Sequence, residues 1–389
     1  MKFAHLADTH LGKRSLKLAE REKDFESAFK QAIDIIIKEN VDFVVHSGDL
    51  FDTGKPDVNS MIFCAKQLYR LKDKGIPVYI IPGSHDQGYG ETKSILSLFE
   101  EAGLLINVGD KRYIKDNKLY GEMYKDVFIC GIGGWKSRIS ELYKSIEPVI
   151  PKEAKYKIFM LHQTVSAVSN IFADIDTELL PKGFDYYAAG HWHGREIMKY
   201  HGKPLIYPGS LENCDATEME RNEKKGIFIV ENNTPRFVQI KSRKVVVKKF
   251  EFDDGSPESI TQKCIDFISS KVDEKPILIL RLTGSINGKR SEIDKALINK
   301  TAIENGYLYA NVMLSGLREP EEEKISIESE NVDQIEKEYL KSKGYTDKQI
   351  DLAKKLMSVL GQELTPSEIE RLSLKMYKMI ENEIEKDKT

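Results

Sequence analysis

Residues 3–12 read FAHLADTHLG, an apolar run followed at once by an aspartate and a histidine. The run 2–7 has the composition of a buried strand, and Asp8 and His10 come directly after it. Loops that follow buried parallel strands lie at the carboxyl edge of a sheet, where binding sites occur. One such pair does not establish a site. Whether Asp8 and His10 belong to a binding site depends on the residues at the other strand ends.

The first 110 residues alternate between strand and helix patterns. Strands are expected at 2–7, 41–46 and 77–81, and helices at 20–39, 57–74 and 92–102. This alternation indicates an α/β domain with parallel strands. After residue 110 short apolar runs dominate. We expect these runs to form a second sheet that closes a sandwich with the first: 127–131, 157–161, 185–189, 204–207, 226–231 and 236–241.

A chain of 389 residues has room for two or three domains. We predict a first domain over 1–243, a small α/β unit over 244–317, an acidic linker over 318–333 and a helical hairpin over 334–389. The linker is rich in charge and poor in apolar residues. In the hairpin, Thr365-Pro366-Ser367-Glu368 is a helix start, with apolar residues following at helical spacing. Two helices bury little surface, so the hairpin either folds back on the body or docks on a partner.

The net charge of −3 excludes a global polycation for nucleic acid or membrane binding. The acidic tail hides a slightly basic body, because residues 319–389 carry a net charge of −6 and residues 1–318 carry +3. No apolar stretch approaches the ~20 residues of a membrane helix, and the first residues are not a signal peptide. The cysteines show no metal-binding spacing, which indicates free thiols in a reducing compartment. We therefore expect a cytoplasmic protein. The four cysteines are Cys64, Cys130, Cys214 and Cys264.

Polar residues recur at five predicted strand ends. They are Asp8 and His10, Asp49, Ser84-His85-Asp86, His162, and His191 with His193. The carboxyl ends of parallel strands meet at one edge, and residues i and i+2 of an extended segment point the same way. Five histidines at equivalent edges with two aspartates therefore predict a metal site. The other three histidines, His5, His46 and His201, are interpreted as structural or surface residues.

The ligand types select the metal. Imidazole mixed with carboxylate favours Mn, Fe or Zn over Mg or Ca, and we expect no cysteine ligand. The candidate ligands are too many for one ion and suit two, bridged by a carboxylate such as Asp49. Two metal ions clamp the attacking and leaving oxygens of phosphoryl transfer and lower the pKa of bound water from ~15.7 toward ~7. The pattern therefore predicts hydrolysis of a phosphate ester.

These segments resemble the five sequence blocks of the calcineurin-like metallophosphoesterases. The blocks are Asp8-x-His10, Gly48-Asp49, Gly83-Ser84-His85-Asp86, His162 and Gly190-His191-Trp192-His193. Four longer segments are similar to DNA double-strand-break repair nucleases of the Mre11 and SbcD type, in an archaeal form. They are His10-Leu11-Gly12, Gly48-Asp49-Leu50-Phe51, Leu161-His162-Gln163 and Tyr207-Pro208-Gly209-Ser210-Leu211-Glu212. The resemblance covers 1–240 specifically and extends to 313 and to the tail.

The resemblance implies a two-sheet metallophosphoesterase sandwich flanked by helices, a small α/β capping domain and a C-terminal helical hairpin. It implies a Mn-dependent DNA exonuclease or endonuclease with two Mn²⁺ per subunit, in which a two-metal-activated water hydrolyses phosphodiesters at double-strand breaks. The implied partners are DNA ends and single strands, and a coiled-coil ATPase of the Rad50 type bound by the hairpin. The family also forms a homodimer, here through the helices near 57–74 and 92–102.

The resemblance also implies roles for single residues. Asp8, His10 and His193 would bind one metal, and His162 and His191 the other, with Asp49 between them. His85 would stabilise the phosphate in the transition state or protonate the leaving 3′ oxygen.

Two positions depart from the family pattern. Ser84 stands where the family has an asparagine metal ligand, and Asp52 stands where the nucleases usually have a histidine. Ser84 would bind the second metal directly, bind it through water, or leave the position to solvent. Asp52 would repel a substrate phosphate.

Basic residues follow the first two blocks and could hold DNA phosphates, although each could equally be a solvated surface residue. They are Lys13, Arg14, Lys17 and Lys55. Two other functions stay open at this point: a phosphoesterase for small substrates, and a weakened nuclease that mainly tethers DNA. A small substrate requires neither a capping domain nor a helical tail.

Overall fold

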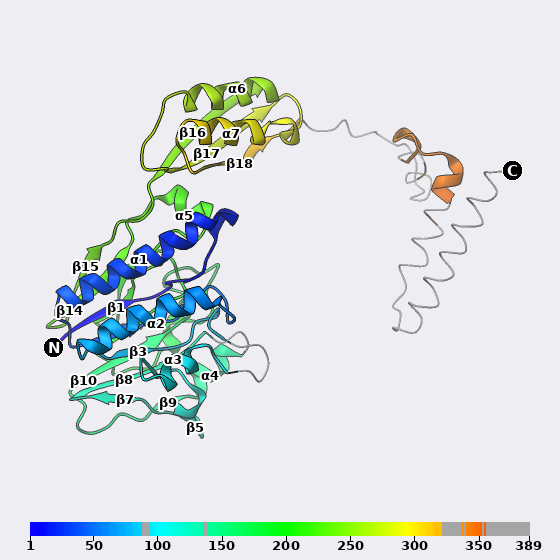
Figure 1. Cartoon of the computed structure of the whole chain (residues 1–389). Helices are drawn as coiled ribbons and strands as arrows, with labels where there is room; N and C mark the ends of the chain where they lie inside the picture. The colour runs from blue at the N-terminus through cyan, green and yellow to red at the C-terminus, as the bar shows by residue number, and fades with distance from the viewer. Residues whose placement is uncertain (88–92, 135–137, 321–336, 338–339, 352–353, 355–389) are drawn as a thin grey trace. The chain divides into compact units, whose positions relative to one another are not determined.

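The computed structural model describes residues 1–87, 93–134, 138–320, 337, 340–351 and 354 (Figure 1). Met1–Glu319 form one compact unit and Pro320–Thr389 a second. Most of the predicted linker and hairpin lies outside the described residues, and the division at residue 243 stays a prediction. Among the described residues, no helix has the length and apolar character that crossing a membrane requires.

The first sheet has six strands in the order β15-β14-β1-β2-β3-β4. Four of them run parallel: β1 (Lys2–Leu6), β2 (Phe43–His46), β3 (Val78–Ile80) and β4 (Ile106–Asn107). The hairpin of β14 (Gly226–Glu231) and β15 (Thr234–Gln239) pairs with β1 in the antiparallel sense. Our placement of these two strands in the second sheet is wrong, because their apolar pattern suits either sheet and does not identify the neighbouring strand.

The second sheet also has six strands, in the order β12-β13-β11-β10-β8-β7. Its parallel centre holds β8 (Val127–Ile132), β10 (Tyr156–Leu161), β11 (Tyr186–Ala189) and β13 (Lys203–Tyr207). The antiparallel edges are β7 (Glu122–Tyr124) and β12 (Glu196–Tyr200). A small third sheet holds β5 (Ile114–Lys115), β6 (Lys118–Leu119) and β9 (Glu147–Pro148). The predicted two-sheet α/β sandwich is confirmed.

Alternation along β1 shows how the layers form. Phe3 faces the core between the two sheets, where it stacks on Phe43 of β2. Ala4 and Leu6 face the opposite way, into a second core against the helices. That core is covered by α1 (Ala19–Lys38), α2 (Val58–Asp73) and the short α3 (Leu96–Glu101). On the far side, α4 (Ile139–Ser145) packs through Tyr143 on the second sheet.

His5 joins the two sheets inside the core, as the structural interpretation expected. Its Nδ1 lies 3.0 Å from the hydroxyl of Tyr186 on β11, and its Nε2 lies 3.0 Å from Oγ of Ser47. Ser47 in turn donates to the carbonyl oxygen of Ala188. Burial, together with the neighbouring His46, lowers the pKa of His5 to about 3. The imidazole therefore stays neutral at physiological pH and serves as a polar link in an apolar layer.

The helix predicted over 92–102 is shorter than expected, since α3 begins at Leu96. The Ser94 hydroxyl donates to the carbonyl oxygen of Asp86 and lies 3.3 Å from the backbone N of Leu96. A serine that bonds to the backbone in this way competes with helix formation, so the chain turns here before the helix starts.

A third layered unit follows the sandwich. It has three parallel strands, β16 (Val245–Gly255), β17 (Ile277–Ile286) and β18 (Tyr309–Arg318), with α6 (Pro257–Ile268) and α7 (Lys295–Glu304) between them (Figure 1). The strand and helix pattern expected after residue 243 is confirmed. The helix α5 (Ala216–Arg221) contacts this sheet, because Met219 packs against Ile277 and Ile279.

Candidate metal centre

The residues expected at four of the five strand ends come together in two clusters that share Asp49. Donor atoms of Asp8, His10 and Asp49 lie within 4.8 Å of one another, and so do those of Asp49, His162 and His191. His193 joins the first cluster, with its Nε2 3.1 Å from Nε2 of His10. These groups come from loops after β1, β2, β10 and β11, so the carboxyl edges of both sheets contribute.

The backbone reaches this arrangement through left-handed conformations. The φ angles of Asp8, His10, Asp49 and His191 are 52°, 47°, 54° and 80°. Our assumption of extended segments is therefore wrong, although the side chains still converge. Non-glycine residues rarely adopt positive φ, and such strain concentrates at functional sites. The loops thus bring their donors together in a way that ordinary strand geometry does not provide.

Glycines let these loops approach closely. A Cβ at Gly83 would collide with the backbone N and Oδ1 of Asp49, and one at Gly190 would collide with the carbonyl oxygen of Ser47. The small residues in the Gly48-Asp49, Gly83-Ser84 and Gly190-His191 segments are therefore part of the site's construction rather than incidental turn residues.

Hydrogen bonds fix which nitrogen of His162 faces the centre. Its Nδ1 lies 2.6 Å from the carbonyl oxygen of Ser47, an acceptor, so Nδ1 carries the proton. The lone pair of Nε2 then points toward Oδ2 of Asp49, 3.1 Å away, and Nε2 has no hydrogen-bond partner although it is buried. Two electron-rich atoms this close need a cation or a proton between them.

A hydrogen bond also fixes which nitrogen of His193 faces the centre. Its Nδ1 donates to Oε1 of Glu218 at 2.7 Å, which leaves the Nε2 lone pair facing Nε2 of His10. Oδ1 of Asp52 lies 3.2 Å from Nδ1 of His10, and although that buried nitrogen makes no hydrogen bond with the described residues, the negative charge favours a proton on it. Both Nε2 atoms then face one point, where they share a hydrogen bond. Oδ1 of Asp8 lies 3.9 Å from Nε2 of His193, and Oδ2 of Asp49 lies 3.8 Å from Nε2 of His10. A metal ion fits this donor set, and outer carboxylates of this kind commonly orient metal-binding histidines.

The pKa shifts of His162 and Asp49 also indicate a position that attracts a cation. Burial works to lower the pKa of His162, but the Asp49 carboxylate outweighs it and raises the pKa to about 9. Burial works to raise the pKa of Asp49, and His162 and His10 outweigh it, so that pKa lies well below its usual range. The point between Asp49 and the histidines therefore attracts positive charge.

Asp86 has a different role from its neighbours in the Ser84-His85-Asp86 segment. Its buried carboxylate accepts hydrogen bonds from the backbone N–H groups of Leu50, Phe51 and Gly83. Burial, with a further contribution from Asp49, raises its pKa to about 6. Asp86 holds the second and third loops together and lies outside both clusters of metal-binding groups among the described residues.

His85 is exposed beside the centre and is oriented from two sides. Its backbone N–H donates to Oδ1 of Asp49 at 2.8 Å, and its Nδ1 donates to the carbonyl oxygen of Asp52 at 2.8 Å. Its ring lies 5.0 Å from that of His10, centroid to centroid. Nε2 is therefore the atom available to a substrate. Ser84, the residue before it, is partly exposed on the same loop.

Asp52 does not present a bare negative charge. Nζ of Lys13 lies 2.7 Å from Oδ1 of Asp52, the oxygen that also faces His10. This pairing of Asp52 and Lys13 offsets the repulsion of phosphate that the sequence suggested. It also occupies one predicted DNA-binding lysine.

The remaining basic candidates differ in their surroundings. Arg14 pairs with Glu22, with 2.7 Å between Nε and Oε2. Lys17 and Lys55 are exposed, and neither makes an ion pair within the part of the chain that the structure describes. Lys17 and Lys55 are therefore available to bind phosphates, whereas Lys13 and Arg14 are already paired with acidic residues.

Sequence reasoning missed two residues of the centre. Glu218 lies on α5 and supports His193, and its other oxygen accepts from Lys225 at 3.0 Å. Cys214 lies just before α5, with its sulfur within 4.8 Å of ring nitrogens of His10 and His193. From the sequence we expected no cysteine ligand and did not single out Cys214. Neither residue follows a predicted strand, and α5 is only six residues long, so no pattern in the sequence marked them.

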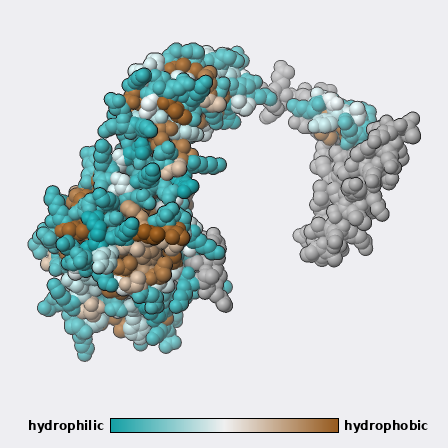
Figure 2. Space-filling model, in the orientation of Figure 1, coloured by the Kyte–Doolittle hydropathy of each residue, from teal (hydrophilic) through white to brown (hydrophobic). Residues whose placement is uncertain are grey.

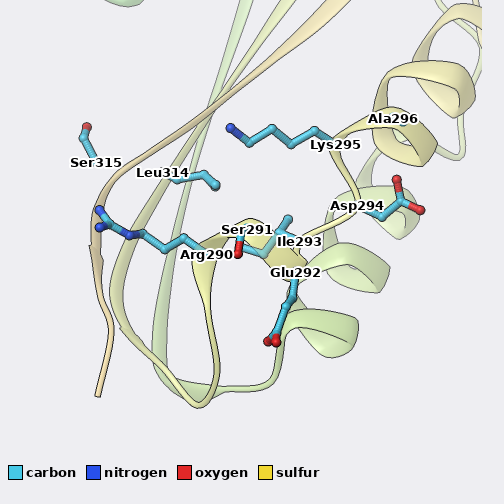
Figure 3. A pocket seen from close by; sticks show the side chains of 9 residues that line it. All are labelled: Arg290, Ser291, Glu292, Ile293, Asp294, Lys295, Ala296, Leu314 and Ser315. Carbon is cyan, nitrogen blue, oxygen red and sulfur yellow. The ribbon is translucent and has the colours of Figure 1, made fainter. Parts of the chain in front are cut away.

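One open hollow, of about 760 Å³, lies away from these clusters, in the three-stranded unit after the sandwich (Figure 3). Arg290 and Lys295 point toward it, and Leu314 and Ser315 line its other side. None of the predicted metal ligands or DNA contacts lines this hollow.

The fold and the two clusters are those of a calcineurin-like phosphoesterase, whose family model matches residues 1–195 and so spans all the predicted metal ligands. The DNA double-strand break repair protein Mre11 of Sulfolobus acidocaldarius is 30% identical over 379 residues, 93% of this chain and 95% of that protein. Mre11 of Saccharolobus solfataricus is 37% identical over 240 residues, 59% of this chain and 60% of that protein. The chain therefore belongs to the Mre11 family of calcineurin-like phosphoesterases.

A solved structure described as a novel archaeal phosphodiesterase also aligns with the chain. The alignment has a TM-score of 0.33 and 16% identity, and it covers 62% of this chain and 100% of that one.

Proposed function

We propose that the protein is a metal-dependent DNA nuclease that processes double-strand breaks by hydrolysing phosphodiesters. The observation that carries this proposal is the orientation of His162, His193 and His10, whose Nε2 atoms all face the carboxylates of Asp8 and Asp49, where a metal ion would replace protons. The substrate class rests on the similarity to Mre11 proteins over most of the chain.

Asp8, His10 and His193 would hold one metal ion, and His162 and His191 the other, with Asp49 shared between them. Mixed imidazole and carboxylate donors suit Mn²⁺, and two such ions supply an activated water and a clamp on the phosphate oxygens. Ser84 is proposed as a weak additional oxygen ligand of the second ion, since it lies on the loop that carries His85.

Other side chains of the protein would contact the substrate. His85, with Nδ1 held by the carbonyl oxygen of Asp52, would present Nε2 to the phosphate or to the leaving 3′ oxygen. Lys17 and Lys55, with Lys13 and Arg14 in a lesser part, would hold the phosphates of the DNA backbone. Because Lys13 neutralises Asp52, the centre accepts an anionic substrate despite the missing histidine.

The exposed faces of α2 and α3 support a homodimer. Val58, Ile62 and Tyr69 of α2 and Leu98 of α3 are 47–64% exposed. Figure 2 shows hydrophobic residues gathered over this part of the surface. Val58, Ile62 and Tyr69 lie four and seven residues apart and so share one helix face, which a second copy could cover.

The test is cleavage of labelled single- and double-stranded DNA with Mn²⁺, with Mg²⁺ or with chelator. We expect Mn²⁺-dependent cutting by the unmodified chain and none with chelator. His85→Gln should abolish turnover while Mn²⁺ still binds, and full activity of that variant would contradict its role. Ser84→Asn tests the departure from the family: cutting only after this change would favour the tethering function. Cleavage confined to small phosphate esters would favour the small-substrate function.

A further inference from the structure

Cys214 differs from the other three cysteines in its surroundings. Cys64, Cys130 and Cys264 lie within apolar clusters. Cys214 instead lies beside the metal centre, where its Sγ and one ring nitrogen each of His10 and His193 are within 4.8 Å of one another. The side chain of Cys214 is nearly buried, at 5% exposure, and His10 is 1% exposed. The sulfur, which donates to the carbonyl oxygen of Glu212 at 3.6 Å, therefore lies beside two histidines and outside the apolar clusters.

Glu218 fixes this arrangement from behind. Its Oε1 accepts from Nδ1 of His193 at 2.7 Å, while its Oε2 accepts from the backbone N–H of Cys214 at 3.1 Å. One buried carboxylate thus positions both His193 and the loop that carries the thiol. Lys225 donates to the same Oε2 at 3.0 Å and balances its charge. Metal-binding side chains in proteins are commonly oriented by hydrogen bonds of this kind from groups that do not bind the metal.

A second observation points to a cation at this spot independently of the cysteine. The Nε2 atoms of His10 and His193 lie 3.1 Å apart, so a shared proton or a cation must lie between them. The carboxylates of Glu218 and Asp52 face the two Nδ1 atoms, which leaves this Nε2 pair as the place where a metal ion would replace the proton. The thiol is the soft donor nearest to that position among the described residues.

We propose that Cys214 is a reserve thiolate ligand of the cation held by His10 and His193, and that it gives this position a preference for soft divalent cations such as Zn²⁺ or Co²⁺ over Mn²⁺. Thiolate sulfur favours such ions, whereas Mn²⁺ favours oxygen donors. On binding, the S–H group releases its proton to water and Sγ takes a coordination position. This inference rests on the proposed metal centre and concerns which ions it takes.

The test is a Co²⁺ titration of the metal-free full chain, followed by absorption. Histidine and carboxylate ligands give Co²⁺ bands in the visible region, and a thiolate ligand adds a charge-transfer band in the near ultraviolet. We expect both in the unmodified chain. Cys214→Ser and Cys214→Ala should keep the visible bands and lose the near-ultraviolet band. Cys264→Ser, which changes a thiol in the β16–β18 unit, should keep both.

The outcomes separate this inference from the proposed function. Visible bands without a near-ultraviolet band in the unmodified chain, or a near-ultraviolet band that survives in a well-folded Cys214 variant, would overturn the assignment of Cys214. Absence of all Co²⁺ bands would contradict the metal centre itself. In competition, the affinity for Zn²⁺ relative to Mn²⁺ should fall about tenfold or more in Cys214→Ser. An unchanged ratio would overturn the preference, and circular dichroism checks that each variant is folded.

Discussion

At the scale of single residues, the candidate metal centre includes carboxylates that would support its ligands without binding the ion. Glu218 accepts the Nδ1 proton of His193 and so keeps Nε2 free for coordination. We expect Glu218→Gln to weaken metal binding by about 10–100-fold, because the charge that orients His193 is lost. Calorimetric titration with Mn²⁺ measures the change. Glu220→Gln is the matched control, since Glu220 lies on the same helix but pairs with Arg281. Equal losses in the two variants would refute the positioning role.

His5 gives the fold a dependence on pH. Its pKa is about 3 in the folded chain and about 6.5 when unfolded, so the unfolded state binds the proton more readily between these values. The stabilising contribution is complete above pH 6.5 and falls by about 1.4 kcal/mol for each pH unit below it, until the pH reaches about 3. Denaturant unfolding of the metal-free chain at several pH values measures this slope. His5→Gln should reduce it, and an unchanged slope would assign the effect elsewhere.

Most residues of the candidate metal centre could be predicted because each follows an apolar strand, a pattern that is visible in the sequence alone. Glu218 and Cys214 could not, because what places them is a six-residue helix held by tertiary contacts. The ion pair of Lys13 with Asp52 was also hidden, although both residues were singled out, since no local rule joins two loops that far apart in sequence.

At the scale of elements, α2 is the clearest case of a face without a partner within the described part of the chain. Ile62 is 47% exposed on the same face as Val58 and Tyr69. A lysine there would place a charge in the proposed dimer contact. We expect Ile62→Lys to convert a dimer into a monomer, as measured by light scattering, with cleavage per site little changed. Lys30→Glu, a charge change on α1, should leave the dimer intact. A monomeric unmodified chain would contradict the proposed contact.

Strand and helix positions were largely predictable, whereas strand partners were not. The run 226–231 was recognised as a strand, but its antiparallel pairing with β1 depends on where the chain returns. The length of α3 was overestimated because one serine hydroxyl redirects the backbone before Leu96. Apolar periodicity reports which face of an element is buried and leaves its neighbour undefined.

At the scale of the whole molecule, α5 connects the metal centre to the three-stranded unit. Glu218 supports His193, the next residue Met219 packs on Ile277 and Ile279, and Glu220 pairs with Arg281. Three consecutive residues thus serve the centre and the unit beyond it. The two parts of Met1–Glu319 are therefore joined at the helix that orients His193, a proposed metal ligand.

The segment after residue 330 is predicted to serve a partner rather than the centre. We expect deletion of 331–389 to leave Mn²⁺-dependent cleavage intact and to remove binding to a Rad50-type ATPase. Co-purification of the ATPase with the full and shortened chains measures this. Retained binding by the shortened chain would refute the role of the hairpin, and lost cleavage would mean that the tail supports the nuclease directly.

The left-handed backbone at Asp8, His10, Asp49 and His191 has a consequence for descent. The positive φ angle of each such residue destabilises the folded state by about 1–3 kcal/mol. This cost persists because the side chain is needed for the chemistry of the site. A lineage that no longer needed catalysis would be free to replace these residues with glycine, which adopts positive φ without strain. Glycines at positions 8, 10, 49 and 191 would then mark a relative that has kept the fold, become more stable and lost the chemistry.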